Sequence, residues 1–149
     1  MHPEFYEQIR TEHNEVKQIL NRMLNSSPSR RETLIKELKV ALVPHLEGEE
    51  KVFYPVLDSK RESHEIILEA LLEHRIARNL FNELMDLNVD ADDWIARTKV
   101  LKDIIEHHIE EEESEIFQAG EKLISHEQIS QIYEKYIQEE KGLKDRLAA

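Results

Sequence analysis

Apolar residues recur at intervals of three and four along four stretches of this chain, which is the period of an α-helix. The stretches span residues 6–24, 34–56, 67–85 and 94–116, and a short polar segment comes after each of the first three. Because short loops force consecutive helices to run antiparallel, the pattern predicts an all-α, up-down-up-down four-helix bundle.

Proline and glycine are expected to shape two of these helices. Pro44 and Pro55 lie inside the second stretch, where a proline removes a backbone hydrogen bond and bends or tightens the helix. Gly120 follows the fourth stretch, and we expect it to end that helix, since glycine is favoured just after a helix.

A fifth helix is predicted over about residues 125–146, as an addition to the bundle. Ser125, with Gln128 three residues later, has the spacing of a capping box that begins a helix. The apolar side chains fall on one side, so we expect this helix to pack across the bundle or onto a second subunit in a homodimer. The 149 residues fit a single domain, residues 1–149, with the bundle in residues 1–118.

Composition excludes several classes of protein. The formal net charge is −12, whereas nucleic acids and anionic membranes require a basic surface, so neither is expected as a partner. The chain has no cysteine, which excludes disulfides, thiolate zinc sites and iron–sulfur ligation by its own thiols. No segment has the length and apolar character of a leader or a membrane span, so a cytoplasmic location is expected.

One motif occurs twice in the chain. Each copy is a His-x-x-x-Glu segment, and each is preceded by a lone histidine that directly follows a glutamate. The two copies suggest a duplicated helical hairpin. The two copies of the motif, with their lone histidines, contain six candidate residues: His13, His45, Glu49, His74, His108 and Glu112.

These six side chains are expected to bind metal. Residues four apart on a helix share a face, so each motif directs an imidazole and a carboxylate toward one point. At 1.5 Å per residue, the two histidines of each antiparallel hairpin differ in height by only roughly 5 Å. Imidazole and carboxylate without thiolate suit iron, manganese or zinc, and four histidines with two glutamates suit two ions better than one. We therefore expect a dinuclear site.

Simpler interpretations exist for some of these residues. A lone histidine on an apolar face is usually a core residue, but four at one level with two glutamates favour a metal. His107 and Glu111 repeat the four-residue spacing and could compete with His108 and Glu112. His107 is the weaker candidate, because it continues no apolar stripe. Within the acidic run Glu110–Glu113, only Glu112 is expected to turn inward.

Two residues near the motifs have no single interpretation. Arg78 lies one turn after His74. Either its stem packs inside while the guanidinium reaches the end of the bundle, which we favour, or it points at the centre and pairs with a bridging carboxylate or an anionic ligand. Gly48 lies between His45 and Glu49 and weakens the helix, for no reason visible in the sequence.

A lone histidine followed by His-x-x-x-Glu, then the same again, resembles the hemerythrin-like family, also called the HHE cation-binding domain, over the first 118 residues. The segments Val52–Pro55 and Ile116–Gln118 are similar to the apolar-aromatic-proline endings of the family. The resemblance implies that the four histidines are terminal iron ligands. It also implies that Glu49 and Glu112 bridge two Fe ions in a non-haem di-iron centre with an oxo or hydroxo bridge.

The oxygen-carrying members of that family use a fifth histidine on the third helix. Here the positions one turn before and after His74 are Ala70 and Arg78. The ligand set is closer to that of members linked to sensing, iron handling, nitric oxide or repair of iron centres.

The leading hypothesis is a di-iron protein that binds, senses or reacts with a small ligand (O2, NO or H2O2) at open coordination positions. An alternative is a module for iron handling, iron sensing or iron-centre repair, in which metal occupancy is the signal. A ferritin-like oxidase ranks lower, because its Glu-x-x-His hallmark is absent, and a purely structural bundle ranks last. The same ligands serve binding and turnover, so both an enzyme and a binding protein stay open.

Overall fold

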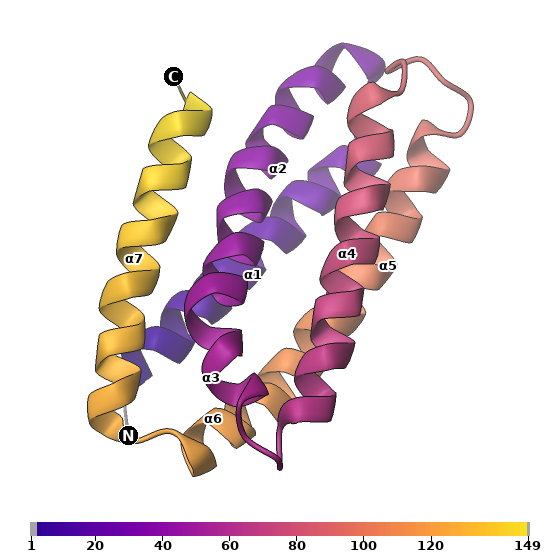
Figure 1. Cartoon of the computed structure of the whole chain (residues 1–149). Helices are drawn as coiled ribbons and strands as arrows, with labels where there is room; N and C mark the ends of the chain where they lie inside the picture. Colours follow the sequence, from indigo (N-terminus) through magenta and orange to yellow (C-terminus); the bar gives the residue numbers. More distant parts are fainter. Residues whose placement is uncertain (1–2, 149) are drawn as a thin grey trace.

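The computed structural model describes residues 3–148, and the described part of the chain contains helices and no strand. Seven α-helices are joined by short loops or by two π-helical turns, η1 and η2 (Figure 1). The elements are α1 (Pro3–Leu24), α2 (Pro28–Gly48), η1 (Glu49–Phe53), α3 (Tyr54–Asp58), α4 (His64–Asp86), α5 (Trp94–Glu111), η2 (Glu112–Ile116), α6 (Phe117–Leu123) and α7 (His126–Ala148).

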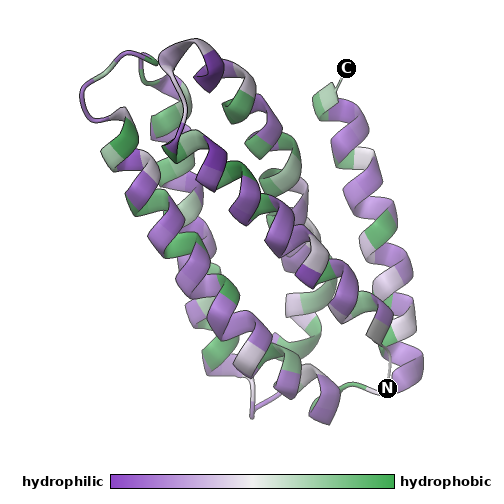
Figure 2. Ribbon diagram, turned by 180° about the vertical axis from the view of Figure 1, so that it is seen from behind, coloured by the Kyte–Doolittle hydropathy of each residue, from purple (hydrophilic) through white to green (hydrophobic). Residues whose placement is uncertain are grey.

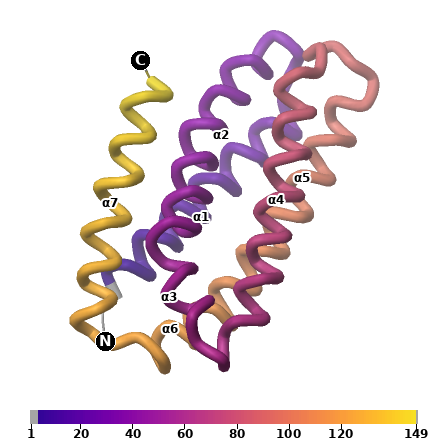
Figure 3. Tube along the Cα trace, in the orientation of Figure 1, coloured from indigo at the N-terminus to yellow at the C-terminus, as the bar shows by residue number. Residues whose placement is uncertain are grey.

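The helices form two antiparallel hairpins packed side by side. α1 and α2 make the first hairpin and α4 and α5 the second, and α1 also packs on α5. Figure 3 shows the two hairpins next to each other and α7 on the outer side of the first hairpin, away from α4 and α5. The predicted all-α, up-down-up-down bundle with an additional C-terminal helix is confirmed.

The apolar core is divided into two clusters along the bundle axis. One cluster lies toward the α1–α2 and α4–α5 loops and includes Leu20, Phe81 and Trp94. The other lies toward α3 and α6 and includes Phe5 and Phe53. A layer of buried histidines and glutamates belongs to neither cluster. The fold therefore places its polar centre between two apolar cores.

Each helix presents a mixed pattern to its surroundings. Hydrophilic and hydrophobic residues alternate along every helix in Figure 2, as expected for helices with one buried side and one solvated side. Among residues 3–148, the structure contains no helix whose length and apolarity would allow it to cross a membrane.

The second and fourth helices of the bundle each change to a π-helical turn, which the sequence did not reveal. η1 begins at Glu49 and η2 begins at Glu112, and such turns insert one extra residue into a helix. The apolar stripe expected to continue through Val52 is therefore displaced by one residue, and Phe53 is buried instead. Pro55 occupies the first turn of α3, where a missing N–H costs no hydrogen bond.

Gly120 does not end the fourth helical stretch, contrary to expectation. α6 continues past it to Leu123. Gly120 is buried, and a Cβ atom there would collide with the hydroxyl of Tyr6. This glycine is needed for the close approach of α1.

The C-terminal helix packs on its own bundle through its apolar side. Its start agrees with the capping prediction, because the backbone N–H of Gln128 donates to Ser125 Oγ at 3.1 Å. α7 contacts α1, α2 and η1. The contact with α2 explains Gly48, because a Cβ there would lie 2.6 Å from Cε1 of the buried Tyr136 ring.

Candidate metal centre

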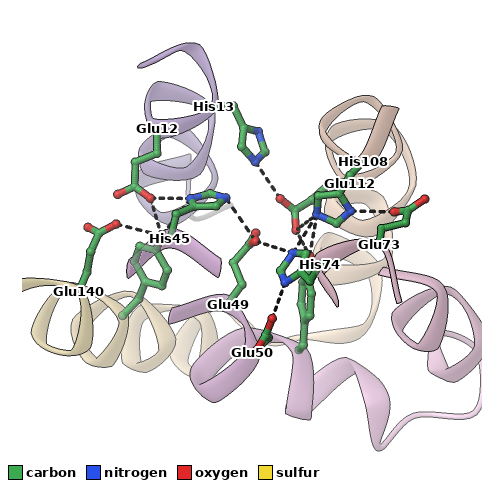
Figure 4. A network of polar contacts seen from close by, with 12 residues as sticks. Glu12, His13, His45, Glu49, Glu50, Glu73, His74, His108, Glu112 and Glu140 are labelled. Atoms are coloured by element: carbon green, nitrogen blue, oxygen red, sulfur yellow. Dashed lines mark hydrogen bonds and ion pairs between the residues drawn. The ribbon is translucent and has the colours of Figure 1, made fainter. Parts of the chain in front are cut away.

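The six residues singled out by the sequence lie together in the polar layer. All six are buried, with relative exposures between 0% and 5%. Their donor atoms fall into two groups, each small enough to surround one ion: His13, His45, Glu49 and Glu112 in the first, and Glu49, His74 and His108 in the second. Glu49 belongs to both groups. Figure 4 shows these side chains converging from α1, η1, α2, α4, α5 and η2.

Each of the two central glutamates reaches across to the other hairpin. Glu49 Oε1 lies 3.2 Å from His45 Nε2 in its own hairpin and 3.4 Å from His74 Nε2 in the other. Glu112 lies 2.9 Å from His13 Nε2 through Oε1 and 3.9 Å from His108 Nε2 through Oε2. Both carboxylates therefore lie between the two histidine pairs, with Glu112 closer to His13 than to His108.

Every histidine of the centre is held by a carboxylate on its other ring nitrogen. The four Nδ1 pairs are His13 with Glu113 at 2.6 Å, His45 with Glu12 at 2.8 Å, His74 with Glu50 at 2.7 Å and His108 with Glu73 at 2.8 Å. Such partners fix the tautomer and the ring orientation of metal-binding histidines.

The ionisation of these outer carboxylates decides the direction of the hydrogen bonds. In Glu113 the bond from His13 lowers the carboxyl pKa. In Glu12, Glu50 and Glu73 burial opposes the change, but the bonded histidines and their neighbours still leave each pKa below its ordinary value. An ionised carboxylate only accepts, so each Nδ1 is the donor and Nε2 is the ring atom that faces the centre.

Despite burial, the charges of Glu49 and Glu12 raise the pKa of His45 well above its ordinary value, so a metal would displace a proton from that ring. His74 Nε2 and His108 Nε2 lie 3.0 Å apart, within hydrogen-bond distance of each other.

The outer carboxylates follow a rule that repeats in the two hairpins. Glu12 and Glu73 each directly precede a central histidine, while Glu50 and Glu113 each directly follow a central glutamate. Each of them, however, bonds a histidine on a different helix from its own. Sequence reasoning missed these roles and expected only Glu112 to turn inward from the acidic run, whereas Glu113 also turns inward, to His13. The repeated Glu-His and Glu-Glu pairs were the available signal.

Tyr54 is a further central residue that the motifs did not single out as a site residue. Its hydroxyl donates a short hydrogen bond to Glu112 Oε2 and lies 3.3 Å from His74 Nε2 and 3.2 Å from His108 Nε2. Burial, followed by the charge of Glu112, raises its pKa well above the usual value. The second copy of the motif has Phe117 at the equivalent position. The two halves of the centre are therefore chemically different.

The Arg78 guanidinium neither reaches the end of the bundle nor pairs with a central carboxylate, contrary to both expectations. Its guanidinium binds both oxygens of Glu50, at 2.7 Å and 3.0 Å, and so supports the carboxylate that holds His74. The rival pair lies at the surface, with the His107 side chain 61% exposed and 3.2 Å from Glu111.

The two central glutamates share their negative charge unequally. Burial, together with the charge of Glu112, raises the pKa of Glu49 to about 8. The pKa of Glu112 lies well below its ordinary value, because the effects of Glu49 and the two nearby histidines outweigh burial. The cause is the like charge of the two buried carboxylates, which disfavours ionisation of both at once.

The centre has the chemistry of a cation site. Four of its buried atoms make no hydrogen bond of regular geometry, namely His13 Nε2, Glu49 Oε1, Glu49 Oε2 and Glu112 Oε1. Their close neighbours are one another and His45, with His13 Nε2 2.9 Å from Glu112 Oε1 and His45 Nε2 3.2 Å from Glu49 Oε1. Buried polar atoms without partners are costly, and a bound cation would supply the missing partner to all four. The donor set fits a metal that accepts imidazole nitrogen and carboxylate oxygen.

A small cavity adjoins the donors. Its volume is about 20 Å³, and it is lined by the four histidines, Glu73 and apolar residues of all four bundle helices, including Val16, Leu42, Ala77 and Ile105. A single water needs about 10–15 Å³ by this measure. The cavity therefore suits a ligand of a few atoms and excludes an organic substrate of ordinary size.

Comparisons with known proteins show the family and the fold of this chain. The family model of the hemerythrin HHE cation-binding domain matches residues 4–119. A crystal structure of a hemerythrin HHE cation-binding domain-containing protein from Mycobacterium kansasii has the same fold, with a TM-score of 0.82 and 22% sequence identity over 95% of this chain and 87% of that one. The search of curated proteins found no match. The chain belongs to the hemerythrin HHE cation-binding domain family, as its duplicated motif suggested.

Proposed function

We propose that the six central residues bind two iron ions in a non-haem di-iron centre that binds, senses or reacts with a small ligand such as O2, NO or H2O2. Glu49 and Glu112 would bridge the ions. His13 and His45 would complete one position, and His74 and His108 the other. Tyr54 adds a donor at the second position.

The observation that carries this proposal is the orientation of the four histidines. Each Nδ1 lies within hydrogen-bond distance of a carboxylate, so all four Nε2 atoms face the two central carboxylates before any ion binds. Such preorganisation serves a metal and has no purpose in a purely structural core, where burying six polar groups is costly.

Bound iron would supply Lewis acidity and redox chemistry toward a small ligand. The residues of the chain decide which ligand reaches it. The cavity of about 20 Å³ beside the histidines admits only a few atoms, and its apolar walls favour a neutral molecule over a hydrated ion. The Tyr54 hydroxyl places a proton beside Glu112 Oε2.

The alternative function is iron handling, iron sensing or repair of iron centres, with metal occupancy as the signal. The orphaned donors of Glu49 and Glu112 favour it in one respect, because a fold that buries unpaired carboxylates gains stability on binding metal. A homodimer through α7 and a cytoplasmic location stay predictions from the sequence.

Elemental analysis of Glu112→Gln and Glu111→Gln variants tests the proposal. The two residues are neighbours in the chain, but Glu112 is buried in the centre whereas Glu111 is partly exposed. After anaerobic loading with Fe²⁺, the wild type and Glu111→Gln should hold close to two irons per chain, and Glu112→Gln should lose at least one. One tightly held zinc in place of iron, or equal losses in both variants, would refute the di-iron assignment.

A further inference from the structure

Helix α7 reaches the metal centre, although it lies outside residues 4–119, which match the family model. Its contact with the centre is made by Tyr136, which is completely buried. The Tyr136 hydroxyl donates a short hydrogen bond to Glu12 Oε1 and lies 3.3 Å from His45 Nδ1. The same hydroxyl lies 3.1 Å from Glu140 Oε2, one turn further along α7.

The hydrogen bond from Tyr136 adds a third member to one histidine–carboxylate pair. Glu12 Oε1 accepts from His45 Nδ1 at 2.8 Å and from the tyrosine hydroxyl at the same time. The other oxygen, Oε2, accepts from Gln8 Nε2 at 2.7 Å. Together these donors give the carboxylate one favoured orientation, to which Tyr136 contributes one of these three hydrogen bonds. That orientation directs His45 Nε2 toward Glu49, 3.2 Å away.

Among the described residues, no tyrosine hydroxyl bonds the carboxylate of the equivalent pair in the second hairpin. Glu73 holds His108 as Glu12 holds His45, but the Glu73 side chain is 14% exposed and that of Glu12 only 5%. The residue at the position of Gly48 in the second motif is Glu111, which faces the surface beside His107.

Gly48 gives the Tyr136 ring the room it needs to reach Glu12 in the first hairpin. A Cβ atom at Gly48 would lie 2.6 Å and 2.9 Å from two carbons of the Tyr136 ring. The missing side chain on α2 therefore allows the tyrosine of α7 to reach Glu12.

We infer that Tyr136 is a positioning residue of the metal centre: through Glu12 it fixes His45, so that the docked α7 helix strengthens metal binding at the His13–His45 position and not at the His74–His108 position. This inference rests on the proposed dinuclear centre. Removing the direct outer partner of a metal-binding histidine costs about 10-fold to 100-fold in metal affinity. Tyr136 acts through that partner, Glu12, so loss of its hydroxyl should cost less, about 3-fold to 10-fold, and the loss should fall on one of the two ions.

Titration of the metal-free protein with Co²⁺ tests the inference. Cobalt accepts the same nitrogen and oxygen donors as iron, and its visible absorption reports the ligand geometry. Tyr136→Phe keeps the ring against Gly48 and removes only the hydroxyl. The matched control is Tyr133→Phe, which removes a hydroxyl from a half-buried tyrosine one turn earlier on α7.

We expect two binding steps in the wild type and in Tyr133→Phe. In Tyr136→Phe one step should weaken about 3-fold to 10-fold, with a changed spectrum for that ion alone, while the other step is unaffected. In a His45→Gln background, which already lacks the affected ligand, Tyr136→Phe should have no further effect on the remaining step. In a His108→Gln background its effect should persist.

The possible contrary results are distinguishable. Two unchanged steps in Tyr136→Phe, an equal weakening of both steps, or an effect that persists with His45→Gln would each overturn the inference and leave the proposed centre intact. A wild type that binds no Co²⁺ would refute the proposed centre and the inference with it.

Discussion

Replacing Gly48 with alanine should destabilise the metal-free protein, although alanine ordinarily stabilises helices. Gly48 has helical dihedral angles, φ −60° and ψ −46°, so an added Cβ causes no backbone strain. In an open helix the change would gain about 0.5–1 kcal/mol. Here the new methyl group would lie 2.6 Å from Cε1 and 2.9 Å from Cδ1 of Tyr136, closer than two carbon atoms can approach.

The magnitude depends on whether the Tyr136 ring can move away. The ring is completely buried and packs edge-on against Phe5, with 5.5 Å between centroids. Its hydroxyl is tied to Glu12 and Glu140. Overpacking of a fixed core side chain costs about 1–3 kcal/mol. After the helix gain is subtracted, the expected net loss is about 1 kcal/mol, or ~2–4 °C in Tm for a chain of this size.

Urea unfolding of the metal-free protein, followed by circular dichroism, measures this loss. Gly142→Ala is the control, because a Cβ at Gly142, on α7, meets nothing within 4 Å. That variant should gain about 0.5–1 kcal/mol, so the two variants should differ by about 1–3 kcal/mol. The loss at Gly48 should disappear in a Tyr136→Ala background. A Gly48→Ala protein as stable as Gly142→Ala would mean that the Tyr136 ring moves aside at no cost, contrary to the prediction.

Two further predictions concern the donors. Glu50→Gln should weaken metal binding about 10-fold to 100-fold, because the amide holds His74 less firmly. Arg78→Gln should weaken metal binding less than about tenfold, since its ion pair with Glu50 is partly exposed. Equal losses of affinity in competition titrations would contradict this order. Glu49, with its pKa raised to about 8, and His45, whose pKa the charges of Glu49 and Glu12 raise despite burial, both keep protons that a metal must displace. Affinity should therefore rise at least about tenfold per pH unit toward pH 8. A flat affinity profile below about pH 8 would mean that Glu49 is not a ligand.

The helices and the six central side chains could be predicted from local patterns along the chain. Apolar spacing of three and four is a local property of one helix, and so is the four-residue spacing of His45 with Glu49 and of His108 with Glu112. Short loops then require antiparallel neighbours. For these reasons the bundle and the meeting of the six central side chains could be predicted from the chain alone.

The outer hydrogen-bond partners of those six side chains became visible only in the folded protein. Glu50 and Glu113 bond histidines on other helices, and Tyr136 acts from a helix more than a hundred residues away from Glu12 along the chain. Such pairings depend on the rotation and height of one helix relative to another, which periodicity does not specify. The repeated Glu-His and Glu-Glu pairs in the sequence point to the outer carboxylates, but they do not predict which histidine each carboxylate bonds.

The same distinction explains the two glycines and the π-helical turns. Gly48 and Gly120 are helical residues that a sequence scale treats only as weak points, yet each is required by an aromatic side chain of another helix. η1 and η2 begin at the central glutamates, Glu49 and Glu112, and η1 turns Tyr54 toward the centre. The local sequence determined which faces are apolar, and contacts between helices determined where a side chain had to be absent and where a turn had to widen, because those contacts exist only after the helices have packed.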